Sequence, residues 1–170
     1  MNSLNNYLNQ RFKLSQSENI TEKLKINSKS KINNYKYHPK SSEELRSLIA
    51  KRIEDEKDNI DFNDIDVSDI KYFVGMFCYK SNLTSIDISN WDMSNAEDLE
   101  EMFIGCRNLK TTGDLSKWYT PNLKDITGMF YGCENLEFIG DLNKWDHSNI
   151  TRKQNVFNLC KKLKNIPNWY

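Results

Sequence analysis

The stretch MFIGCRNL at residues 102–109 decides the fold, because it returns as MFYGCENL at residues 129–136. Related versions begin at Met76 and Val156, so successive starts are separated by 26, 27 and 27 residues. A unit of this length cannot bury an apolar face alone, whereas stacked units bury a continuous core. The period predicts an α/β repeat fold, a short solenoid of three and a fraction coils at residues 61–170.

Each coil is expected to hold one short strand, at residues 83–88, 109–115 and 136–142. A turn follows each strand, and a helical or 3₁₀ turn then leads into Met-Phe. Side chains that recur at one place in every coil are expected to stack through the core. The predicted core set is Phe77, Leu83, Trp91, Phe103, Cys106, Leu109, Trp118, Phe130, Cys133, Leu136, Trp145, Phe157, Cys160 and Leu163.

Two further segments precede the coils. Ser41 and Glu44 form a capping-box signature, and apolar residues then recur at helical spacing, which predicts a helix over about residues 42–57. A short strand is expected just before it, so residues 35–60 form a strand and a capping helix. Residues 1–34 are expected to be a flexible basic arm, because residues 1–40 hold eight basic and two acidic side chains.

Composition excludes several classes of protein. The 170 residues carry 24 basic and 24 acidic side chains, so the net charge is zero and a strongly basic nucleic-acid binder is disfavoured. No apolar run is long enough for a transmembrane segment, and no secretory signal is visible. The two histidines have no neighbouring nucleophile, and no phosphate-binding glycine loop appears. We therefore expect no catalytic residues, no cofactor and no small-molecule substrate.

Cysteines and aspartates that recur with the period are candidate metal ligands. Cys106, Cys133 and Cys160 follow the period and lack the close pairing of zinc sites, so a reduced, buried row is favoured over disulfides or a metal site. An aspartate row (Asp61, Asp87, Asp114 and Asp141) could hold calcium, but turn formation is favoured.

Three tyrosines fall outside the predicted core positions. Tyr79, Tyr119 and Tyr131 are candidate partner-binding residues, because tyrosine gives a large contact area at low entropic cost. The alternative is ordinary surface packing.

The pattern Met-Phe-x-x-Cys-x-x-Leu, followed by Asp-Leu-Ser-x-Trp-Asp-x-Ser-Asn, resembles the BspA-like leucine-rich-repeat surface proteins of bacteria. The resemblance covers about Tyr37 to Tyr170. It implies a leucine-rich-repeat solenoid with an adhesive or protein-binding role at the cell surface, and it supplies no catalytic residues.

The leading functional hypothesis is therefore a non-catalytic protein-binding module. An intracellular interaction or regulatory scaffold is the alternative, because no export signal is visible and unpaired cysteines suit a reducing compartment, which makes the cytoplasm the second location. A nucleic-acid-associated protein that uses the basic arm ranks third. The C-terminal coil has no visible cap, so weak self-association through it is expected.

Overall fold

The computed structural model describes residues 35–170, and the predicted basic arm at residues 1–34 lies outside the described residues. The regular elements are α3 (Ser42–Glu56), β1 (Ile60–Asp61), β2 (Ile86–Asp87) and two 3₁₀ helices, η1 (Leu115–Lys117) and η2 (Leu142–Lys144). β1 and β2 pair in parallel, with Ile60 opposite Ile86. Turns and loops make up most of the remainder.

Helix α3 begins where its capping residues predict. Ser41 Oγ accepts a hydrogen bond from the backbone N–H of Glu44, and the Glu44 carboxylate accepts one from the N–H of Lys40. The helix ends at Glu56, one residue before the predicted end, because the C-cap residue Lys57 has a positive φ of 70°. Its buried face consists of Leu45, Ile49 and Ile53.

The prediction of an α/β leucine-rich-repeat-like solenoid is wrong. The described residues hold one α-helix and one sheet of two strands, each two residues long, and they are otherwise mostly loops. The strand predicted at residues 83–88 is reduced to β2. The strands predicted at 109–115 and 136–142 are reduced to isolated bridges at Thr111 and Phe138. Turns replace the predicted helical approach to Met-Phe.

Tight turns explain why the strands are so short. Aspartate carboxylates accept hydrogen bonds from the backbone N–H two residues later, as Asp87 does from Ser89 and Asp114 from Ser116. An extended strand cannot continue through such a turn. The hydropathy period indicates which residues are buried, but it does not reveal these turns.

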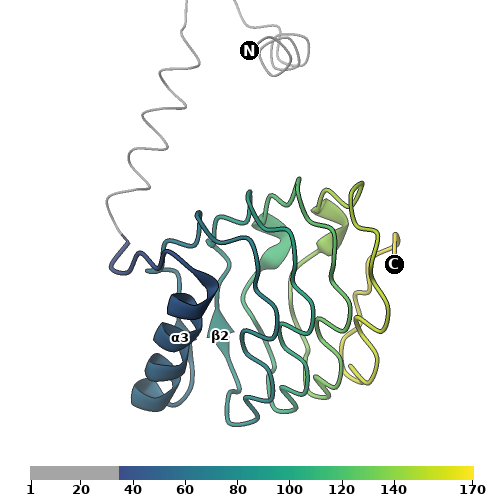
Figure 1. Ribbon diagram of the computed structural model, residues 1–170. Helices are drawn as coiled ribbons and strands as arrows, with labels where there is room; N and C mark the ends of the chain where they lie inside the picture. The colour runs from purple at the N-terminus through teal and green to yellow at the C-terminus, as the bar shows by residue number, and fades with distance from the viewer. Residues whose placement is uncertain (1–34) are drawn as a thin grey trace, which may run out of the picture. The chain divides into compact units, whose positions relative to one another are not determined.

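Segments 26 or 27 residues apart nevertheless lie side by side (Figure 1). We call residues 72–79, 98–105, 125–132 and 152–159 the four strips. Single parallel bridges join them at Tyr72, Asp98, Asp125 and Arg152. Backbone hydrogen bonds between neighbouring strips therefore hold the loops together without long strands.

Aromatic rings fill the core beneath the strips. Phe77, Phe103, Phe130 and Phe157 stack in order, with centroid separations of 5.1, 5.2 and 5.9 Å. Of the predicted core set, only Cys160 and Leu163 are partly exposed, and all the others are buried. Both exceptions belong to the last of the related segments.

Candidate interaction surface

The recurring polar side chains of the sequence motif donate hydrogen bonds inside the fold. Trp118 and Trp145 Nε1 donate to the carbonyls of Ile88 and Leu115, over 3.0 and 2.8 Å. Asn108 Nδ2 donates to the carbonyl of Ser81 over 2.7 Å. The same bond to the preceding segment is made by Trp91, Trp169, Asn95, Asn122, Asn135 and Asn149. These side chains satisfy backbone carbonyls that the short strands leave unpaired.

The cysteine row has the same role. Cys106, Cys133 and Cys160 Sγ lie 2.9, 3.1 and 3.0 Å from the carbonyl oxygens of Phe77, Phe103 and Phe130, respectively. All four cysteines are free. Burial raises the pKa of Cys106 to about 12 and also raises the pKa of Cys133. These thiols therefore stay protonated near neutral pH, whereas a nucleophile or metal ligand must be a thiolate.

The predicted aspartate row closes turns. Asp61, Asp87, Asp114 and Asp141 each accept a hydrogen bond from the backbone N–H two residues later. The structure thus uses these carboxylates in the way the turn interpretation expects.

A different set of three carboxylates lies close together in two neighbouring strips. Oxygens of Asp98, Glu100 and Asp125 all lie within 4.8 Å of one another. Arg152 Nε lies 2.6 Å from Asp125 Oδ2, and Asp125 Oδ1 accepts a hydrogen bond from the N–H of Thr127. Burial, followed by the charge of Asp125, raises the pKa of Glu100. Asp125, the buried member of the cluster, is thus already paired with a cation.

The structure places two of the three candidate tyrosines on one edge. The N–H of Tyr79 donates to the carbonyl of Ile104, and the N–H of Gly105 donates to that of Tyr131, both over 2.8 Å. Leu159 lies in the last strip at the place that Tyr79 has in the first, and Ile104 and Tyr131 lie one place earlier in their strips. We call Tyr79, Ile104, Tyr131 and Leu159 the tyrosine edge. Tyr79 is 69% exposed, Leu159 52% and Tyr131 38%.

Tyr119 does not belong to this edge. It follows Trp118, in the part of the chain where the tryptophan rings stack, and it is 65% exposed. Sequence reasoning also missed Ile104 and Leu159, because only the register between strips reveals that they are neighbours of the tyrosines.

Glycine backbone supports the tyrosine edge. A Cβ atom on Gly105 would collide with the Tyr79 ring, so the ring lies directly against this backbone. Gly105 and Gly132 have φ values of 70° and 75°, a region that favours glycine. The two glycines add no side chain that would cover the aromatic rings.

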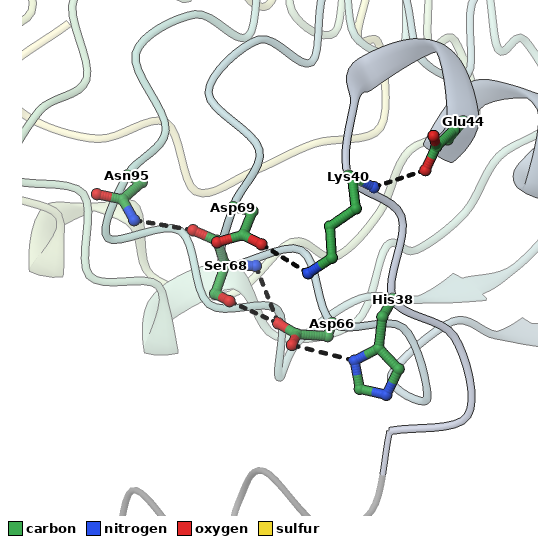
Figure 2. A network of polar contacts seen from close by, with 7 residues as sticks. All are labelled: His38, Lys40, Glu44, Asp66, Ser68, Asp69 and Asn95. Atoms are coloured by element: carbon green, nitrogen blue, oxygen red, sulfur yellow. Dashed lines mark hydrogen bonds and ion pairs between the residues drawn. The ribbon is translucent and has the colours of Figure 1, made fainter.

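A second polar network joins residues 38–44 to the loop that follows β1 (Figure 2). Lys40 Nζ lies 2.8 Å from Asp69 Oδ2, and His38 Nδ1 lies 3.3 Å from Asp66 Oδ2. Burial alone would raise the pKa of Asp66, but hydrogen bonds from Ser68 outweigh it and lower the pKa. The network fixes the approach to α3, and its groups are all paired with one another.

Among residues 35–170, no helix is long and apolar enough to cross a membrane.

One of three comparisons with known proteins gives a match. No curated protein and no solved structure matches the chain. The family model described as "Mycoplasma protein of unknown function, DUF285" matches residues 43–169, which is most of the 170-residue chain. The chain therefore belongs to the DUF285 family.

Proposed function

We propose that this protein is a non-catalytic protein-binding module whose contact surface is the tyrosine edge. The observation that carries the proposal is the set of side chains contributed by all four strips, of which Tyr79, Tyr131 and Leu159 are exposed and Ile104 is half-buried. Tyrosine rings held against backbone lose little conformational entropy on binding, and aromatic side chains are enriched at protein interfaces.

Support for a non-catalytic role comes from the bonds that the recurring polar residues make. The indole N–H groups, the asparagine amides and the thiols already bond to backbone carbonyls. The recurring residues of the motif therefore stabilise the fold. The exposed residues between them can differ from one strip to the next without affecting these bonds.

We propose further that the protein acts at the cell surface. The resemblance to BspA-like proteins favours adhesion at a bacterial surface, with an intracellular scaffold as the alternative and a nucleic-acid role through residues 1–34 as the third candidate. Protease shaving of intact producing cells, with a cytoplasmic marker as control, separates the first two. Cleavage while the marker survives supports the surface; survival until lysis supports the scaffold.

Photo-crosslinking tests the binding edge itself. A benzoylphenylalanine at position 79 or 131, introduced in producing cells, is expected to form a discrete adduct with one protein. Position 119 is the matched control for position 79, because Tyr119 is 65% exposed, close to the value for Tyr79, but lies outside the edge. Equal adducts from all three positions, or adducts from 119 alone, would contradict the proposal. Circular dichroism of each variant checks that the fold is retained.

A further inference from the structure

The four strips have a donor side and an acceptor side. In each of the first three strips, four alternate backbone N–H groups donate to carbonyls of the following strip. Phe77 N, for example, donates to Met102 O, and Phe103 N to Met129 O. The twelve bonds of this kind measure 2.8–2.9 Å, and their donors are residues 73, 75, 77, 79, 99, 101, 103, 105, 126, 128, 130 and 132.

The last strip presents the same row of donors without acceptors. The equivalent N–H groups belong to Lys153, Asn155, Phe157 and Leu159. None of the four donates a hydrogen bond to another described residue. Four unpaired N–H groups at alternate residues form a template that is ready to pair with another segment.

The opposite end of the stack is closed by α3. The carbonyl of Tyr72 accepts a hydrogen bond from Ser42 Oγ over 2.6 Å, and that of Val74 accepts one from Arg46 Nη2 over 2.7 Å. Side chains of the helix therefore replace two of the four donors that a preceding strip would supply. The other end of the ladder has no such replacement for its acceptors among the described residues.

Apolar exposure also increases at the donor end. Ile166 is 39% exposed, whereas Ile139, at the equivalent place one segment earlier, is 1% exposed. Tyr170 covers part of this end, with its ring edge-on to Phe157 at 5.1 Å and its hydroxyl accepting a hydrogen bond from Val156 N over 3.2 Å. Tyr170 is thus a single side chain that packs on this end of the strips.

We propose that the end formed by residues 152–159 binds, in parallel, an extended segment of another polypeptide that resembles the strips themselves. Such a segment supplies carbonyls at alternate residues to the four N–H groups. It also places an aromatic ring flat on Phe157, as Phe130 is placed on Phe103 at an interplanar angle of 2°. The ring of Tyr170 is displaced in the process.

Donor polarity decides between partners. Two copies that met symmetrically through this end would oppose N–H groups to N–H groups. A second copy stacked head to tail would have to lose α3 first, because Ser42 and Arg46 occupy its carbonyl side. The occupant is therefore a segment with a free carbonyl edge, rather than a second intact copy.

Amide hydrogen exchange with a peptide tests the proposal on the full chain. The probe is a synthetic peptide of residues 124–132, KDITGMFYG, which carries the carbonyls and the ring of one strip. At ten times its Kd, the peptide is expected to slow exchange at Lys153, Asn155, Phe157 and Leu159 by about tenfold, by mass action. Exchange at Tyr79 serves as the internal control and should not change.

The matched control peptide has serine in place of the phenylalanine, Phe130→Ser, and should bind about tenfold more weakly, so that at equal concentration it slows exchange of these amides only about twofold. If the parent peptide at about 1 mM does not slow exchange at these amides, its Kd lies well above 1 mM and the proposal is overturned. Equal protection by both peptides overturns the stacking on Phe157. A dimer in sedimentation without peptide overturns the exclusion of a second copy. Leu159 belongs to both surfaces, but Lys153, Asn155 and Phe157 lie outside the tyrosine edge, so protection at these three amides tests the proposal separately from the proposed function.

Discussion

Replacing Glu101 by glycine should stabilise this protein, although glycine usually weakens ordered structure. Glu101 has a φ of 53°, and the residues at the equivalent place in the neighbouring strips are Gly75 and Gly128, with φ values of 57° and 60°. Asn155 continues the row at 58°. The backbone hydrogen bonds between strips impose this left-handed conformation, which is unfavourable for a residue with a Cβ atom.

The magnitude follows from two opposing effects. A non-glycine residue in the left-handed region costs about 1–2 kcal/mol. Glycine loses roughly 0.5–1 kcal/mol more conformational entropy on folding than alanine does. The difference predicts that Glu101→Gly is more stable than Glu101→Ala by about 0.5–1 kcal/mol. The alanine variant is the proper reference, because both variants remove the charge that contributes to the raised pKa of Glu100.

Urea unfolding of the full chain measures the difference as a shift of the midpoint at constant slope. The converse change, Gly128→Ala, should lower stability by a similar amount. The added Cβ would lie 3.5 Å from Glu101 Cγ, an ordinary contact, so conformation alone decides the sign. If Glu101→Gly is no more stable than Glu101→Ala, the left-handed row is not imposed by the strips and the reasoning fails.

Three further predictions concern other parts of the chain. Iodoacetamide at pH 8 should leave Cys106 and Cys133 unmodified in the folded protein, because burial raises the pKa of both thiols. Mass spectrometry should detect labelling of both only after unfolding in urea. Rapid labelling of the folded protein would contradict this prediction. Burial would raise the pKa of Asp58, but hydrogen bonds from Thr84 and neighbouring N–H groups lower it to about 2. The Asp58 carboxylate therefore stabilises the fold fully above pH 3.8, and this stabilisation is lost as the pH falls towards 2. Asp58→Asn should consequently reduce the loss of stability between about pH 4 and 2, measured by urea unfolding at each pH. An unchanged loss in the variant would refute the lowered pKa of Asp58. Arg46→Ala should lower the free energy of unfolding by about 1 kcal/mol, because the carbonyls of Val74 and Gly75 lose a charged donor. Lys51→Ala, which removes an exposed side chain from the same helix, is the control. Equal losses of stability in the two variants would show that the hydrogen bonds of Arg46 do not stabilise this end of the strips.

The resemblance and the period led to a fold with a strand in every coil, which the structure does not contain. Phe, Leu and Trp at equal spacing indicate burial, and burial alone does not distinguish a strand from a sequence of turns. Asp87 and Asp114 illustrate the difference. The sequence indicates that each carboxylate forms a turn, but it does not indicate that the hydrogen bond from the backbone N–H two residues later also ends the strand.

The sequence by itself determined the helix that begins after Ser41, the buried aromatic row from Phe77 to Phe157, and the use of the aspartates in turns. These features depend on local capping groups and on the polarity of single residues, which can be identified along the chain. The tertiary structure alone decided that Tyr79 and Tyr131 share an edge while Tyr119 does not. It also decided that Glu101 adopts a left-handed conformation and that N–H groups all point towards one end of the strips. Those properties arise from backbone hydrogen bonds between residues 26 or 27 apart, and no single segment of the sequence specifies the register or the direction of these bonds.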